Sequence, residues 1–317
     1  MSSTNEVIDL TGESASGATQ PVDLTQSDDE AAPAAKRHRA EPLAKLLVGT
    51  AGIARGSLDA HQAALSFVEI NSTGYGTPAA TTIASWARKS ARGFVVGLKA
   101  PQAITHRKRL DDAAATRDFM AAVAPLGQNL GPILFQTPRT LRCDLEKLRR
   151  LRAAVGPGVK VALEFRHASW RDDPAVLAFL RAEDWALVDH PNSVGRATVG
   201  SRSGGRSSTG HREYAAEPVG RSPRTASWDY VRVHGLNDEH RYRYSAEELA
   251  EIARQVHDLR RRRACDTVFI SFINDDATGA GADNAVACAE LIHGLAGEAV
   301  PRPPKSSRTM RDFFDRK

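Results

Sequence analysis

The chain has 317 residues, of which 41% are hydrophobic, and its formal net charge at pH 7 is +5. This length suits one large α/β domain or two smaller ones, and the apolar fraction is sufficient for a buried core. No apolar run is long enough to cross a bilayer, and the three cysteines lack the spacing of a metal site, so we expect neither feature.

Residues 1–42 are expected to be disordered, because they are rich in Ser, Thr, Ala and acidic residues and contain no aromatic side chain. Two apolar islands in this tail resemble motifs that bind the small ubiquitin-like modifier (SUMO) by adding a strand to its sheet. The predicted SUMO-binding residues are Val7, Ile8, Leu10, Val22 and Leu24. The basic cluster 36–39 is a minimal candidate for nuclear import, so we expect a nuclear protein, with the cytoplasm as the alternative.

Short apolar runs alternate with amphipathic segments through the middle of the chain. Eight runs predict strands, at 45–50, 66–70, 94–99, 132–136, 159–165, 185–189, 230–235 and 267–272. Five segments between them predict helices, at 79–90, 111–123, 141–155, 245–263 and 283–295. Such alternation is typical of right-handed βαβ units, and eight units predict an α/β fold, the closed (β/α)8 TIM-type barrel. A doubly wound open sheet is the alternative, although residues 49–56 only weakly resemble its phosphate loop.

Residues 191–227 are rich in Ser, Gly and Arg and show no apolar period. We expect a long mobile loop here, between the sixth and seventh strands, with the helix of that unit missing or reduced. The predicted barrel domain therefore covers residues 43–296, and tails at 1–42 and 297–317 flank it.

Polar side chains gather at the carboxyl ends of the predicted strands, where barrels of this type carry their active sites. Side chains alternate along a strand, so residues two apart share a face and can point into one mouth of the barrel. We expect a site at this mouth built from Glu69, Asn71, Lys99, His106, Gln136, Glu164, Arg166, His167, Asp189, Arg232, His234 and Asn274. For any one of these residues, the alternative is a satisfied polar layer without chemistry, such as Glu164 paired with Arg232.

The cations at the mouth favour an anionic ligand, such as a phosphate- or carboxylate-bearing small molecule or a nucleotide, and the basic chain also permits nucleic acid. The first hypothesis is a metal-independent hydrolase or lyase, with acid/base catalysis by the candidate catalytic residues Glu69, Glu164 and His234. The second is a divalent-metal phosphodiesterase or nuclease of DNA repair, with metal ligands Glu69, Glu164, Asp189 and His234. The third is a binding module without turnover. The sequence identifies no cofactor.

Seven short motifs follow one another along the chain: FVEINSTGY, GLKAPQAITH, LGPILFQTP, ALEFRHASW, DYVRVHG, RYRYS and FINDDATGAGADNA. In this order they resemble the signatures of the YecE-like family, known as domain of unknown function 72, over about residues 46–296. The resemblance implies a TIM-type barrel and no particular reaction, because none is established for the family. The chain departs from the family's pattern at Gly74, where the family has an aromatic residue.

The C-terminal tail carries apolar side chains in a polar and basic context. Met310, Phe313 and Phe314 resemble the motif that docks on the replication sliding clamp, proliferating cell nuclear antigen (PCNA), although Ser307 stands in place of its usual glutamine. Packing of the Phe pair on the chain's own barrel is the alternative. Together the tails predict recruitment to a SUMO-modified sliding clamp, with two weak motifs acting in concert.

Overall fold

The strands of the protein lie in parallel and form one sheet. The computed structural model describes residues 43–190, 218–235, 242–262, 265–273 and 280–301. Its strands are β1 (Lys45–Ala51), β2 (Phe67–Ile70), β3 (Val95–Lys99), β4 (Leu130–Gln136), β5 (Val161–Glu164), β6 (Ala186–Leu187), β7 (Trp228–Val233) and β8 (Thr267–Phe272). Their order in the sheet is β6-β5-β4-β3-β2-β1-β8-β7, so consecutive strands are neighbours except β6 and β7, and β1 pairs with β8.

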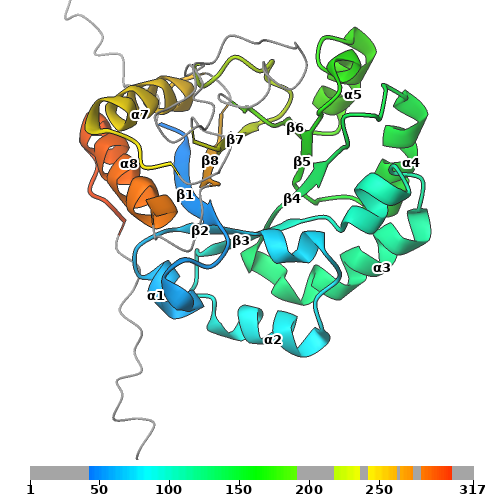
Figure 1. The fold of residues 1–317 in the computed structure, drawn as a ribbon, viewed down its shortest axis with the longest axis horizontal. Coiled ribbons are helices and arrows are strands. Elements are labelled where there is room, and N and C mark those ends of the chain that lie inside the picture. Colours follow the sequence, from blue (N-terminus) through cyan, green and yellow to red (C-terminus); the bar gives the residue numbers. More distant parts are fainter. Residues whose placement is uncertain (1–42, 191–217, 236–241, 263–264, 274–279, 302–317) are drawn as a thin grey trace, which may run out of the picture. The chain divides into compact units, whose positions relative to one another are not determined.

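The two outer strands of this sheet meet and nearly close it into a barrel. An isolated parallel bridge joins Asp189, just after β6, to Val231 of β7. The Asp189 amide donates to the Tyr230 carbonyl at 2.8 Å, and the Arg232 amide donates to the Asp189 carbonyl at 2.9 Å. Figure 1 shows the helices arranged around the strands. The predicted (β/α)8 TIM-type barrel is therefore confirmed.

The helices on the outside of the barrel are α1 (Leu58–Gln62), α2 (Ala80–Lys89), α3 (Ala113–Val123), α4 (Leu145–Val155), α5 (Pro174–Ala182), α7 (Ala246–Arg260) and α8 (Ala280–Ala296). The five predicted helices are present, and α7 begins with the predicted capping box of Ser245 and Glu248. Helices α1 and α5 were not predicted from the sequence. The Asp173 carboxylate caps α5 by accepting from the amides of Ala175 and Val176, and Pro174 takes the first helical position. An Asp-Pro pair is a typical helix start, so residues 173–174 could have predicted α5.

Each helix buries an apolar face against the outward side chains of the strands. Ile83 of α2, Phe119 of α3, Leu148 of α4 and Val256 of α7 are all buried. They belong to the two larger clusters of the core, which lie between the strands and the helices. None of the helices in the described ranges has the length and apolar character needed to cross a membrane.

A smaller cluster fills the inside of the barrel, and its largest members form what we call the aromatic layer: Phe67, Trp228, Tyr230 and Phe269. The centroids of the Phe67 and Phe269 rings lie 5.3 Å apart, in an edge-to-face arrangement. Neighbouring strands approach closely here, since a side chain at Gly49 would lie 1.9 Å from the Phe67 carbonyl oxygen. The barrel interior is therefore packed at this level by described side chains.

Several sequence predictions fall outside the described residues. They comprise most of the loop 191–227, the tail 1–42, the part of the C-terminal tail from 302 to 317, and with them Asn274, Val7, Ile8, Leu10, Val22, Leu24, Met310, Phe313 and Phe314. These stay predictions.

Candidate functional site

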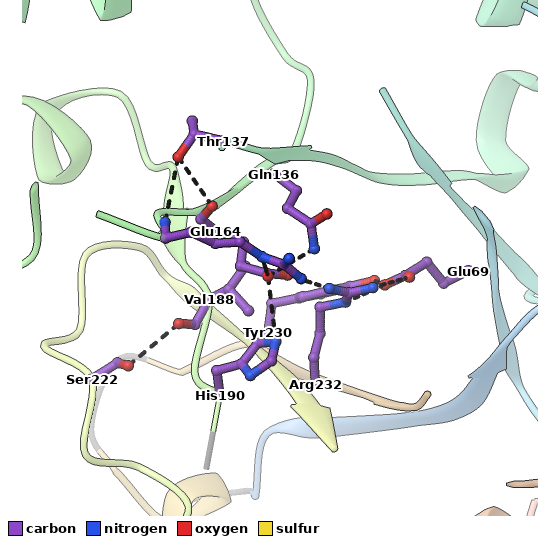
Figure 2. A network of polar contacts seen from close by, with 10 residues as sticks. Glu69, Gln136, Thr137, Glu164, Val188, His190, Ser222, Tyr230 and Arg232 are labelled. Carbon is purple, nitrogen blue, oxygen red and sulfur yellow. Dashed lines mark hydrogen bonds and ion pairs between the residues drawn. The ribbon is translucent and has the colours of Figure 1, made fainter. Parts of the chain in front are cut away.

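A buried layer of charges lies two residues beyond the aromatic layer, at the carboxyl end of the strands. Its centre is Arg232 of β7, whose side chain is only 1% exposed. Its Nε and Nη2 donate to Glu69 Oε2 and Oε1 of β2 at 3.0 and 2.8 Å, and its Nη1 donates to Glu164 Oε2 of β5. Figure 2 shows the guanidinium reaching both carboxylates. We call Glu69, Glu164 and Arg232 the charged layer.

The charges of this layer compensate one another, as burial in a medium of low polarity requires. Burial alone would disfavour the Arg232 cation, but Glu69 and Glu164 together raise its pKa above the usual value. Glu69 also accepts a hydrogen bond from the Tyr230 hydroxyl, whose pKa is raised by burial and by the Glu69 charge. Glu69 is thus held by the Tyr230 hydroxyl of the aromatic layer as well as by Arg232.

Glu164 has a wider set of partners. Its Oε1 accepts from Gln136 Nε2 at 2.8 Å and from Arg166 Nε at 3.0 Å, and His190 Nε2 lies 3.5 Å away. Burial would raise the pKa of this carboxyl, but Arg232, His190 and Arg166 together hold it well below its usual range. Glu164 is therefore ionised at neutral pH and is a weak proton acceptor, better suited to orienting His190 than to taking a proton from a substrate.

His190 lies next to this carboxylate, and the His234 ring packs beside the His190 ring. The centroids of their rings are 4.2 Å apart, and the ring planes are inclined by 32°. The pKa of His190 is lowered because burial outweighs the attraction of Glu164, so its imidazole is neutral at pH 7. His190 is not among the predicted site residues. The alternation of Ala186, Val188 and His190 along one face could have identified it.

Lys99, at the end of β3, belongs to the rim of the site. The Thr73 hydroxyl donates to its carbonyl oxygen at 2.6 Å. Its side chain runs past Gly74, where a Cβ atom would lie 3.2 Å from Lys99 Cδ. Burial lowers the pKa of the amine and the charge of Arg232 lowers it further, against the attraction of Glu164 and Glu69. Within the described ranges, no hydrogen-bond or ion-pair partner contacts its Nζ.

His106 is a second titratable group of the rim. It lies on a π-helical turn, η3 (Ala103–Arg107), a distortion that often occurs at functional sites. Its Nδ1 is 2.9 Å from the Thr105 hydroxyl. Its pKa is lowered by burial and by the charges of Lys99 and Arg166, so the ring is neutral at pH 7. Neighbouring positive charges therefore lower the pKa of both Lys99 and His106.

Three predicted site residues do not join these charges. The Asp189 carboxylate accepts from the amides of Gly220 and Ser222, so it fixes the segment before β7. His167 Nδ1 accepts from the Ser169 amide and caps the short turn η5 (Ala168–Trp170). Asn71 begins the turn η2 (Asn71–Gly74), where its Oδ1 is buried and accepts no hydrogen bond from the described residues.

The remaining predicted residues do come together, since contacts or mutual electrostatic influence connect Glu69, Lys99, His106, Gln136, Glu164, Arg166, Arg232 and, through His190, His234. The four ligands of the metal hypothesis, Glu69, Glu164, Asp189 and His234, do not form a metal site. Among the residues that the structure describes, no three of the His, Cys, Asp and Glu side chains are grouped so that they could hold a metal ion. Both glutamates are instead engaged with Arg232.

The family model described as "Protein of unknown function DUF72" matches residues 49–308. No curated protein matches the chain. A DUF72 family protein of Enterococcus faecalis V583 aligns with a TM-score of 0.63 and 19% identity over 83% of this chain and 100% of its own. A DUF72 family protein of Thermotoga maritima MSB8 aligns with a TM-score of 0.58 and 23% identity over 80% of this chain and 100% of its own. At these identities, the likeness to the solved structures concerns the fold alone.

Proposed function

Because the chain belongs to the DUF72 family, whose description names no function, we propose a function from the site itself: the barrel is an enzyme that acts on a substrate bearing a phosphate or carboxylate group. One observation carries this proposal. Among the residues that the structure describes, Lys99, Arg166 and Arg232 lie near two carboxylates, and the buried Arg232 already pairs with both of these. Among the described residues, Arg166 bonds Glu164 through its Nε alone, so its terminal nitrogens remain for a ligand.

Arg166 is the side chain best suited to contact such an anion. It is 34% exposed, and its Nε bonds Glu164, so its orientation is fixed while part of it faces solvent. A guanidinium oriented in this way can bind a carboxylate or phosphate with two parallel hydrogen bonds. Lys99 would add a hydrogen-bond donor from the neighbouring rim.

The histidine pair is the proposed source of acid/base chemistry. An imidazole can both accept and donate a proton, whereas an ionised carboxylate with a strongly lowered pKa is a weak proton acceptor. In this proposal His234 exchanges protons with the substrate. The His190 ring packs against the His234 ring and holds it in place, and Glu164 orients His190. Glu164 and Glu69 act as positioning residues, and the reaction class is a hydrolase or lyase.

Calorimetric titration of the full chain with inorganic phosphate tests the proposal. We expect saturable binding, and Arg166→Gln should weaken it by roughly tenfold, the effect of losing one charge-assisted hydrogen bond. Arg149→Gln is the matched control, because Arg149 is exposed on α4 and pairs with Glu146 of the same helix. No binding, or equal affinities for the two variants, would contradict the anion site. Binding by wild type without turnover of any phosphate or carboxylate ester would favour a binding module instead.

The tails motivate a second proposal, recruitment to SUMO-modified sliding clamp in the nucleus. It rests on the two SUMO-interaction-like islands and on the clamp-docking spacing of the C-terminal residues. Two weak motifs on one target can raise the overall affinity by roughly 10². A pull-down compares wild type with alanine variants at Ile8 and Leu10 and at Phe313 and Phe314. If every variant still retained SUMO and the sliding clamp, the proposal of recruitment through the tails would be wrong.

A further inference from the structure

Lys99 is held differently from the buried arginines of the protein. Arg232 pairs with Glu69 and Glu164, and Arg260, at the end of α7, donates to both carboxylate oxygens of Glu298 at 2.9 Å. The Lys99 amine is half-buried, but within the described part of the chain no carboxylate lies at ion-pair distance from it. A cation needed only for stability would be expected to have such a partner.

The position of this amine is set by the main chain and by packing. The Lys99 carbonyl accepts from the Thr73 hydroxyl, and the next amide, that of Ala100, donates to the Leu134 carbonyl at 2.8 Å. The aliphatic stem passes against Gly74, which has no side chain to displace it. Packing thus positions the amine, and no salt bridge with a described residue occupies it. A nucleophilic amine needs both conditions.

The surroundings of Lys99 favour its uncharged form. Its charged and titratable neighbours are Glu69 of β2, Glu164 and Arg166 of β5, Arg232 of β7 and His106 of η3. Burial and the two arginines lower the pKa of the amine, and the glutamates offset this only in part. An amine that is desolvated and placed beside other cations is a typical nucleophile toward carbonyl compounds.

We propose that Lys99 is a catalytic nucleophile that forms an imine with an aldehyde or ketone substrate bearing a phosphate or carboxylate group. The neutral amine attacks the carbonyl carbon, so a C–N bond forms and the C–O double bond becomes a single bond. Proton transfers from nitrogen to oxygen then release the oxygen as water and leave a C–N double bond. A neutral imidazole such as His106 can carry these protons, and no oxidant or reductant is required. This inference rests on the proposed function for its anionic substrate group.

Reductive trapping of the full chain tests it. Glyoxylate, an aldehyde with a carboxylate, and cyanoborohydride at pH 7 convert a lysine that forms an imine to carboxymethyl-lysine, which peptide mass spectrometry locates. We expect Lys99 to react several-fold faster than Lys89, which is exposed at the end of α2. Lys99→Arg keeps the charge and should remove only this fast reaction, while its melting temperature shows that the variant folds. A Lys99 rate equal to or below that of Lys89 would overturn the inference.

A second aldehyde separates this inference from the anion site. Glycolaldehyde has nearly the size of glyoxylate but a neutral hydroxymethyl group in place of the carboxylate. We expect Lys99 to prefer glyoxylate by several-fold, and Arg166→Gln to remove the preference. Fast labelling of Lys99 by both aldehydes, together with no phosphate binding, would sustain the nucleophile and overturn the anion site. Phosphate binding without fast labelling of Lys99 would sustain the anion site and overturn the nucleophile.

Discussion

Two adjacent layers inside the barrel are stabilised by opposite means. In the aromatic layer, ring centroids lie 5.3–6.5 Å apart, mostly edge to face. In the charged layer, one guanidinium connects two carboxylates from strands β2 and β5. Tyr230 belongs to both, because its ring packs on Phe67 at 6.0 Å and its hydroxyl donates to Glu69. The layers are only two residues apart along each strand.

The comparison shows why only one of these layers can carry chemistry. Apolar burial is additive and non-directional, so each ring of the aromatic layer contributes without needing one particular partner. A buried charge is tolerated only while its own partner stays in place. The charged layer therefore depends on specific pairs, and its outer partners Gln136, Arg166 and His190 connect it to the mouth.

The largest effect should follow from Arg232→Met. This change keeps the apolar volume of the side chain but leaves Glu69 without its cation and Glu164 with Arg166 alone, which costs about 3–5 kcal/mol in the free energy of unfolding. Urea denaturation at pH 7 measures it. If orphaned charge is the cause, adding Glu164→Gln to Arg232→Met should restore part of the loss. A double variant no more stable than Arg232→Met would contradict this account.

The stability loss caused by Arg232→Met should depend on pH. In the wild type the pKa of Glu164 is lowered, so its stabilising effect is present above the ordinary carboxyl pKa of about 4.3 and is lost as the pH falls. Without Arg232, burial of Glu164 is opposed by less positive charge, so protonation costs less. The stability difference between the two proteins should therefore shrink as the pH falls from 7 toward 4.

A smaller effect without pH dependence should follow from Phe269→Leu in the aromatic layer. The change removes apolar area from a fully packed position and should cost about 1–2 kcal/mol. The cost should be the same at pH 5 and pH 7, and phosphate affinity should not change. A cost that varies with pH would show that the two layers are coupled more tightly than their separate contacts indicate.

The strands of the barrel could be predicted because their apolar runs are short and regularly spaced. The pairing of Glu164 with Arg232 could also be anticipated, since both stand at strand ends on inward faces. The role of Tyr230 could not, because an apolar strand accommodates tyrosine whether or not its hydroxyl has a buried partner. His190 was missed because it lies one residue beyond the predicted strand 185–189.

Asp189 illustrates a different limit of the sequence. Its side chain at a strand end suggested a ligand, but its main chain forms the bridge to β7 and its carboxylate binds amides of the following segment. A carboxylate that caps a loop and one that faces a mouth look alike in sequence. Only the path of the chain after the strand distinguishes them, and residues 191–227 carry no pattern that predicts this path.

The smallest effect on stability, with a clear effect on reactivity, should follow from Gly74→Ala at the rim of the charged layer. The new Cβ would lie 3.2 Å from Lys99 Cδ, so the flexible stem must move by a few tenths of an ångström. Such a shift should cost less than about 1 kcal/mol, and the stiffer unfolded chain offsets part of it. The amine would nevertheless leave its position, so labelling by glyoxylate should slow several-fold.

Gly76→Ala is the matched control for this variant. It lies in the same segment after β2, and a Cβ atom at this position would meet nothing within 4 Å. Lys99 in Gly76→Ala should therefore react like the wild type. Equal labelling of Lys99 in both alanine variants would mean that contact with Gly74 does not position the amine. The rim would then depend, like the charged layer beneath it, on electrostatic partners alone.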